Sequence, residues 1–154
     1  MKNEFERSQD QREYVVLKEV AEMLPPADEL ASYIENKEYK KLVSLVSSAP
    51  AADIAERMSN IPREYLTRFF RLLPKEMASE VFVLMEQEEN EQIINSFSDS
   101  ELSNMLEELY LDDTVDIIEE MPANVVKRII KNSTPENRSL IIAFFTIRRI
   151  RQAR

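Results

Sequence analysis

The sequence predicts an all-α fold: a superhelical array of short helix pairs built from 24-residue repeats, with an N-terminal cap helix. Apolar residues recur at helical spacing, as in Ala78, Val81, Phe82 and Met85. No segment alternates with the period of two that is typical of strands. The chain has no Gly, so its turns are expected to use Pro, Ser, Asn and Asp instead.

The repeat is marked by residues spaced 24 positions apart: Pro26, Pro50, Pro74, Ser98 and Pro122. An apolar residue follows each marker by eight positions: Ile34, Met58, Phe82, Leu106 and Ile130. Each unit also carries an apolar pair nineteen and twenty positions after its marker, from Leu45-Val46 to Ile141-Ile142. Each unit therefore predicts one helix that starts at the marker, where proline's missing N–H is tolerated, and a second that carries the pair. Such units stack into a superhelix because each buries its apolar face on its neighbours.

Three segments follow from this pattern. Residues 1–12 are predicted to be a flexible N-terminus, residues 13–145 the helical-repeat domain and residues 146–154 a basic C-terminal tail. Within the domain, Glu13 to Leu24 predicts the cap helix, with an apolar side formed by Tyr14, Leu17, Val20, Ala21 and Leu24. For the tail, a frayed end is favoured over a helix on a membrane surface, although arginines beside apolar residues also suit anionic lipids.

The composition excludes several kinds of chemistry. Without Cys or His, the chain has no thiol nucleophile, no histidine base, no disulfide and no zinc site of the usual type. Glutamates such as Glu107, Glu108, Glu119 and Glu120 can act as acids or bases, but nothing in the sequence places a pair around a pocket. We therefore predict a protein that is not an enzyme, with no catalytic and no cofactor-binding residues. No signal peptide and no apolar run near the ~20 residues of a membrane span is present, so the chain is expected to be soluble.

The net charge of −9 is unevenly distributed. Between Lys75 and Lys127 there is no Lys or Arg, but there are fifteen Asp and Glu. Such carboxylates repel one another and weaken a compact fold. Either they are spread over solvated faces, or a hard divalent cation such as Mg²⁺ or Ca²⁺ neutralises them through oxygen ligands. Nucleic acid is a poor partner for the body of the chain because phosphate binding needs a basic face, and only the basic C-terminal end is an exception.

Two stretches resemble a known family: FFRLLPKEMASEVF (Phe69–Phe82) and LEELYLDDTVDIIEEMP (Leu106–Pro122). Together with the repeats, they resemble the N-terminal cytosolic domain of MgtE magnesium channels over roughly Leu24 to Phe145. Their most specific element is L-x-L-D-D-x-x-D at Leu109–Asp116. The resemblance implies homodimeric Mg²⁺ channels of bacterial plasma membranes. It also implies that this region is a helical superhelix on the cytoplasmic face, followed by tandem CBS domains, a plug helix and a pore.

The resemblance also implies a regulatory role. In the family, intracellular Mg²⁺ binds acidic residues between the N domain and the CBS domains and locks the channel closed. The corresponding Mg²⁺ ligands here are Asp112, Asp116 and Glu80, and the implied partners are the CBS domains of the full-length homodimer. After Phe145 the sequence departs from the family and reads TIRRIRQAR. The CBS and membrane parts are thus expected to be absent, as in an excised fragment, a truncated gene product or a stand-alone relative.

The spacing of Asp112 and Asp116 has its own interpretation. Residues at i and i+4 share a helix face, where like charges destabilise an isolated helix by about 0.2–0.5 kcal/mol, and a bound cation would reverse that effect. The site is expected to be weak and to need the missing CBS domain, and its ligand types also suit Mn²⁺ and Ca²⁺. Two alternatives stay open. Asp112 or Asp113 can instead cap a helix, and the whole array can be a protein-interaction scaffold, such as a flagellar motor switch-like module, without a metal role.

Overall fold

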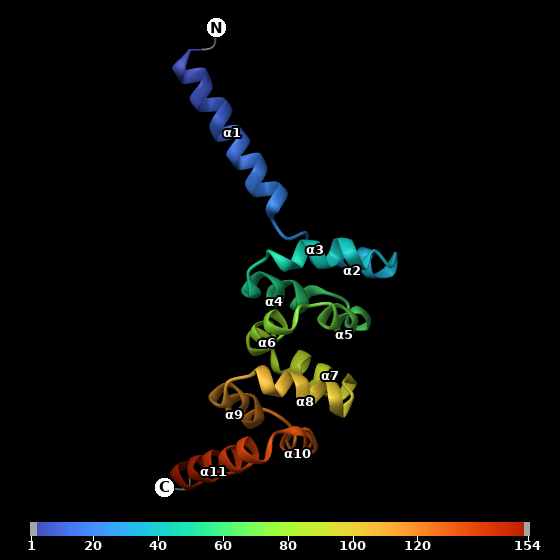
Figure 1. Ribbon diagram of the computed structural model, residues 1–154, viewed down its shortest axis with the longest axis vertical. Coiled ribbons are helices and arrows are strands. Elements are labelled where there is room, and N and C mark those ends of the chain that lie inside the picture. The colour runs from blue at the N-terminus through green and yellow to red at the C-terminus, as the bar shows by residue number, and fades with distance from the viewer. Residues whose placement is uncertain (1–2, 153–154) are drawn as a thin grey trace.

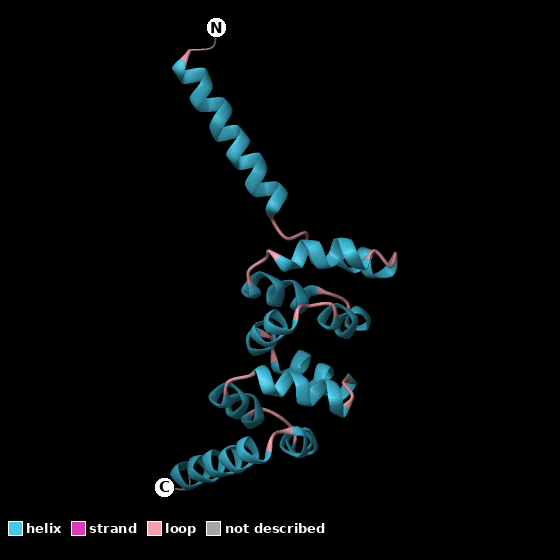
Figure 2. Cartoon of the chain, viewed as in Figure 1, coloured by secondary structure: helices cyan, strands magenta, loops and turns pink. Residues whose placement is uncertain are grey.

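The computed structural model describes residues 3–152, except for the side chains of residues 16–22. The helices of this part of the chain are joined by short loops, and it has no strand (Figure 2), which confirms the predicted all-α fold class. Its helices are α1 (Glu4–Glu22), α2 (Ala27–Glu35), α3 (Tyr39–Ser47), α4 (Ala51–Asn60), α5 (Arg63–Arg71), α6 (Lys75–Leu84), α7 (Gln87–Ser96), α8 (Asp99–Glu108), α9 (Leu111–Glu119), α10 (Ala123–Asn132) and α11 (Pro135–Gln152).

The 24-residue repeat is confirmed as a unit of two helices. Helices α2, α4, α6, α8 and α10 each start one residue after a marker, so the marker is the N-cap residue. The marker prolines have φ between −54° and −61°. Their carbonyls accept the first intrahelical bond, as from Ala78 N to Pro74 O at 2.8 Å. Ser98 replaces proline with a capping box, in which its hydroxyl and the Glu101 carboxylate each accept a backbone N–H.

The helices stack along one axis (Figure 1), and helix pairs from successive units contact each other. Helices α2, α4, α6, α8 and α10 pack in succession, whereas α5 packs on α7 and α9 on α11. The predicted apolar positions lie between them: Ile34, Met58, Phe82 and Leu106 are buried, and Ile130 is partly buried. At the centre, the Phe70 ring contacts Phe82 at 6.0 Å and Phe97 at 5.7 Å between centroids. The core is therefore continuous from repeat to repeat.

The N-terminal helix differs from the prediction. Helix α1 begins at Glu4, so residues 4–12 are helical where the sequence predicted a flexible segment. It extends away from the array (Figure 1), and Tyr14, expected on the packed side of a cap helix, is 68% exposed. Leu24 is buried as expected. Leu17, Val20 and Ala21 lie outside the side chains that the structure describes.

The C-terminal tail is also helical. Helix α11 continues through Phe145 to Gln152, so the frayed end predicted from residue 146 is wrong for residues 146–152. The sequence contains no Gly or Pro after Pro135 that would end the helix. One side of this helix packs on α9 through Ile141, while Leu140, Phe144 and Ile147 remain exposed.

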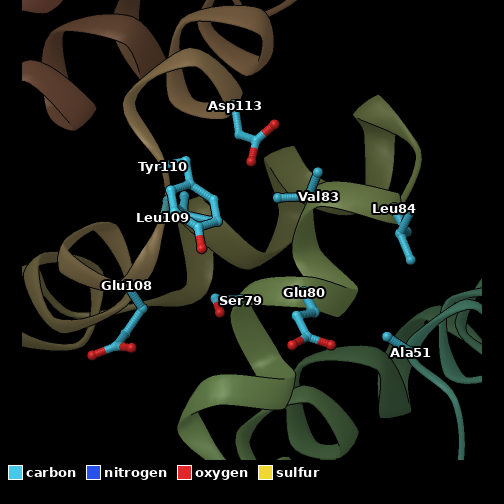
Figure 3. A pocket seen from close by; sticks show the side chains of 9 residues that line it. All are labelled: Ala51, Ser79, Glu80, Val83, Leu84, Glu108, Leu109, Tyr110 and Asp113. Atoms are coloured by element: carbon cyan, nitrogen blue, oxygen red, sulfur yellow. The ribbon is translucent and has the colours of Figure 1, made fainter.

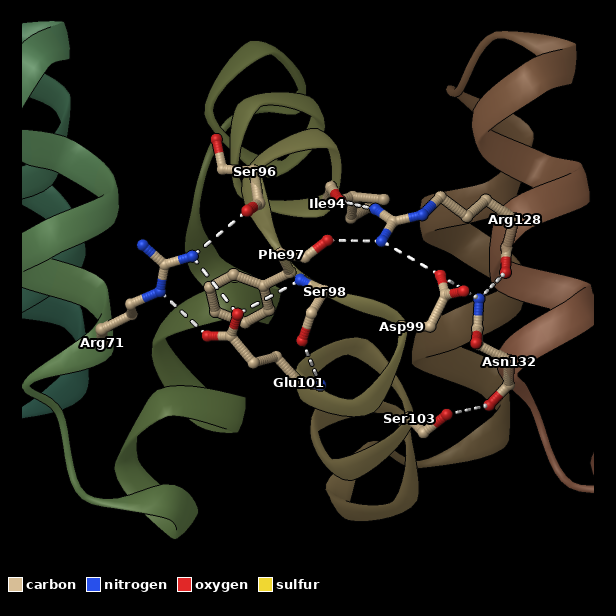
Figure 4. A network of polar contacts seen from close by, with 10 residues as sticks. All are labelled: Arg71, Ile94, Ser96, Phe97, Ser98, Asp99, Glu101, Ser103, Arg128 and Asn132. Carbon is tan, nitrogen blue, oxygen red and sulfur yellow. Dashed lines mark hydrogen bonds and ion pairs between the residues drawn. The ribbon is translucent and has the colours of Figure 1, made fainter.

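Arginine side chains bind the free carbonyls at the C-terminal end of a helix in this glycine-free chain. The last carbonyls of a helix have no intrahelical partner, and a glycine C-cap often closes them. Here Arg71 of α5 donates to Ser96 O at 3.1 Å, and Arg128 of α10 donates to Ile94 O and Phe97 O (Figure 4). Arginines from the second and fifth repeats thus close the C-terminal end of α7, which lies in the third. Arg57 donates in a similar way to Leu24 O and Pro25 O, at 2.9 Å each, in the connection between α1 and α2.

Candidate functional site

The predicted acidic element forms the start of α9. Its N-cap residue is Tyr110, so Asp112 and Asp113 lie in the first turn and Asp116 lies one turn further. Neither Asp112 nor Asp113 caps the helix, because the N-cap has no side-chain hydrogen bond. Their charges nevertheless suit the first turn, where the helix dipole favours anions. The structure therefore contradicts the capping interpretation and places all three carboxylates on one short helix.

Asp113 is the carboxylate with the most perturbed surroundings. Burial raises its pKa above the ordinary value, and the negative charges of Asp112 and Asp116 raise it further. Among the described residues, no cation pairs with Asp112 or Asp113. Repulsion within the element is thus left uncompensated at its N-terminal end.

A groove joins this element to Glu80. The groove has a volume of about 320 Å³ and lies between α6, the end of α8 and the start of α9. Figure 3 shows Asp113 on one side of it and Glu80 on the other, with Glu108 and Tyr110 at its edge. Val83, Leu84 and Leu109 supply most of the remaining wall. The structure therefore unites Glu80 with Asp113, whereas Asp112 and Asp116 do not line this groove.

Asp116 lines a second, smaller hollow of about 210 Å³ on the other side of Asp113. It shares this hollow with Asp113, Glu120 and Asn90. Asn90 is 4% exposed, and its Oδ1 has no hydrogen-bond partner among the described residues. Asp113 and Val83 line both hollows, so Asp113 is the carboxylate that they share, and Asp112 lines neither of them.

A cation from the C-terminal helix reaches Asp116. Arg148 Nη1 of α11 lies 3.1 Å from Asp116 Oδ1 and 2.6 Å from Glu119 Oε1. These two carboxylates raise the pKa of the Arg148 guanidinium, Glu119 more than Asp116. The negative charge of α9 is therefore compensated at its C-terminal half and not at its start.

The carboxylates present can supply part of a metal site. Within residues 3–152, no three acidic side chains are arranged so that they hold a metal ion by themselves. Mg²⁺ usually retains several waters and takes only one or two protein carboxylates. Glu80 and Asp116 line different hollows and Asp112 lines neither, so an ion held by one or two of these carboxylates would keep waters and need further ligands.

Two features of the site were not predicted from the sequence. Asp113 was considered there only as a possible helix cap, and its place at both hollows depends on residues that α6, α7 and α9 bring together. Arg148 is separated from Asp116 by 32 residues, and only the contact between α9 and α11 brings them together. The basic composition of the tail was the one sequence signal that pointed to such a pair.

Comparison with known proteins agrees with the fold. Residues 49–146 match the family model of the MgtE intracellular N domain. The chain is similar to a crystal structure of the cytosolic domain of the Mg²⁺ channel MgtE in complex with ATP, with a TM-score of 0.65 and 24% identity. That similarity covers 76% of this chain and 48% of the other, so the chain spans about half the length of its structural relative. No curated protein matches the sequence.

None of the helices described between residues 3 and 152 combines the length and the apolar character needed to cross a bilayer. The family match covers the second helix pair onward and includes both α6, which carries Glu80, and α9, which carries Asp112 and Asp116. Since the matched residues make up more than half of the sequence, the chain belongs to the MgtE intracellular N domain family.

Proposed function

We propose that the chain is a Mg²⁺-sensing regulatory region of a magnesium transporter, on the cytoplasmic face of the bacterial plasma membrane. In this role Asp112, Asp116 and Glu80 bind Mg²⁺ together with a second domain and favour the closed state of the channel. Membership of the MgtE N domain family supports the proposal. So does the similarity of the fold to the cytosolic domain of a Mg²⁺ channel.

The observation that carries the proposal is the uncompensated start of α9. Asp112 and Asp113 occupy the first turn, Asp116 follows one turn later, and the first two have no cationic partner in the described chain. Like charges at this spacing disfavour the helix by about 0.2–0.5 kcal/mol per pair. A divalent cation at this face would turn that repulsion into attraction, so binding is favoured where the charge is left unpaired.

Regulation then depends on the surface of the second domain that supplies the other ligands of the ion. At low Mg²⁺ concentration, the acidic face of this region repels acidic groups of a partner domain, and the closed state loses support. At high concentration, Mg²⁺ bridges the two faces. A ligand shifts a conformational equilibrium only by its difference in affinity for the two states, and an ion shared between two domains binds best when they are together. The CBS domains of the same full-length homodimer are the proposed partner.

The test is the thermal unfolding of the chain at Mg²⁺ concentrations up to about 20 mM, with KCl holding the ionic strength constant. We expect a saturable rise in the unfolding temperature that the Asp112→Asn/Asp116→Asn variant lacks and that Glu80→Gln reduces. A native-state ligand stabilises by mass action, so the rise reports binding. The matched control is Asp53→Asn/Glu64→Gln, which removes the same charge from exposed positions on α4 and α5. Equal Mg²⁺ responses of the wild type and the Asp112/Asp116 variant would show that these residues form no Mg²⁺ site without the second domain and would favour the protein-interaction scaffold.

A further inference from the structure

We propose that the groove between α6, α8 and α9 docks a basic amphipathic segment of a partner protein. An aliphatic or aromatic side chain of that segment lies in the groove, and its Lys or Arg side chains contact the acidic rim. The inference goes beyond Mg²⁺ sensing and does not depend on it, because it needs no metal ion.

The wall of the groove is apolar and uncovered. Leu84 is 54% exposed, Tyr110 is 78% exposed and Val83 is 37% exposed, and all three line the groove (Figure 3). Single exposed apolar residues are ordinary, but several around one concave surface are typical of a binding site. Tyrosine is also enriched among the residues that contribute most to protein–protein affinity. The volume of about 320 Å³ suits one or two large side chains rather than a whole domain.

The rim of the groove selects for positive charge. Glu80 and Asp113 line it and have no cationic partner among residues 3–152. Glu108 also lines it and is paired with Lys75, at 3.2 Å between Oε1 and Nζ. No Lys or Arg lines the groove. An acidic peptide, a nucleic acid or an anionic lipid headgroup would be repelled, whereas Lys or Arg beside an apolar anchor would gain both contacts.

The location of the acidic groups explains why a peptide segment fits better than a small apolar ligand. Glu80 lies on α6 and Asp113 on α9, on opposite sides of the apolar wall (Figure 3). One apolar residue of a peptide, with a basic residue on each side, can contact the apolar wall, Glu80 and Asp113 at the same time. An uncharged ligand of the same volume would bury the wall but leave both carboxylates without compensation.

The test is fluorescence anisotropy with a labelled helical peptide that carries leucines on one face and lysines on the other. All titrations contain EDTA and no Mg²⁺, so their outcome is independent of the Mg²⁺ proposal. We expect the wild-type chain to bind the peptide, and Leu84→Ser/Tyr110→Ser to weaken binding about tenfold or more. Glu80→Gln/Asp113→Asn should weaken it to a similar extent and should flatten its dependence on salt.

The controls separate a groove from general charge attraction. Leu140→Ser/Ile142→Ser removes two exposed apolar residues from α11, and Asp53→Asn/Glu64→Gln removes two distant charges. Both should bind like the wild type, while a peptide with serines in place of leucines should bind poorly to all variants. Equal binding by the groove variants and the wild type would overturn the proposal. Self-association of the chain that is abolished both by Leu140→Ser/Ile142→Ser and by the groove variants would also overturn it, because the occupant would then be α11 of a second copy.

Discussion

Arg148 donates a hydrogen bond to Asp116, with 3.1 Å between Nη1 and Oδ1, and so places a fixed cation on a carboxylate proposed to bind Mg²⁺. The same guanidinium lies 2.6 Å from Glu119. Arginine stays charged at every physiological pH. A metal ion at Asp116 must therefore compete with a counter-ion that belongs to the chain itself, whereas at Asp112 it meets no such competitor among the described residues.

The first prediction concerns this competition. Replacing Arg148 by Gln should lower the Mg²⁺ concentration at which the unfolding temperature rises half-way, by about threefold or more, because the ion then no longer competes with the guanidinium for Asp116. The same titration at constant ionic strength provides the measurement. Arg149→Gln is the matched control, since Arg149 is exposed on the same helix and has no partner in the described chain. Identical half-points for the two variants would show that Arg148 does not compete with the metal.

The second prediction concerns acid stability. The hydrogen bonds from Arg71, at 2.9 and 3.3 Å, are the main cause that lowers the pKa of Glu101 below its ordinary 4.5. A carboxyl group with a lowered folded pKa contributes stability above its unfolded pKa and loses it as the pH falls through the folded value. Glu101→Gln should therefore lower the free energy of unfolding by about 0.5–1 kcal/mol at pH 7, and this difference should shrink as the pH falls below the ordinary Glu pKa and vanish once it has passed the lowered folded pKa.

Urea denaturation at several pH values measures that difference. Glutamine preserves the capping box with Ser98, so the variant removes the charge and little else. A difference that stays constant from pH 7 to pH 3 would mean that Glu101 acts through packing rather than through its charge.

The third prediction concerns the arginine that closes α7. Arg128→Lys keeps the positive charge but cannot donate to Ile94 O and Phe97 O together, because an ammonium is a point donor and a guanidinium a planar fork. Leaving a part-buried carbonyl without a donor costs about 1–3 kcal/mol. The urea midpoint should fall accordingly, while Arg68→Lys, the same change at an exposed position of α5, should leave it in place. A midpoint unaffected by Arg128→Lys would mean that water replaces the guanidinium at these carbonyls.

Much of the fold could be predicted because the same marker and apolar positions recur in every 24-residue unit. The markers from Pro26 to Pro122 correctly place the starts of five helices, and the apolar positions eight residues later are buried or partly buried. The start and the packing of the N-terminal helix could not be predicted. Its first residues form a helix through their own propensity, whereas a search for apolar spacing detects only a helix that packs on a partner. Residues 4–14 are rich in Glu, Gln and Arg, which favour a helix without requiring an apolar face. The apolar pattern alone therefore set its start too late, at Glu13.

The candidate site was less predictable for a related reason. The i, i+4 spacing placed Asp112 and Asp116 on one helix, and the structure agrees. The groove that joins Glu80 to Asp113 depends on how α6, α8 and α9 pack, and the ion pair of Arg148 depends on α11 continuing as a helix to Gln152. Such contacts link residues about 30 positions apart, and no spacing rule within one helix describes them.

The two arginines that close α7 couple the free energies of different repeats. Unfolding α10, in the fifth unit, would remove Arg128 and leave the carbonyls at the end of α7, in the third unit, without that donor, so the third unit is less stable without the fifth. In a linear array, stability is the sum of intrinsic and nearest-neighbour terms, and here polar contacts add to the apolar ones. Cooperative unfolding should therefore extend over several units, and a single excised repeat should not fold. A conformational change imposed on α9 or α10 by a bound ion or partner would consequently be transmitted along the array instead of dissipating within one helix pair.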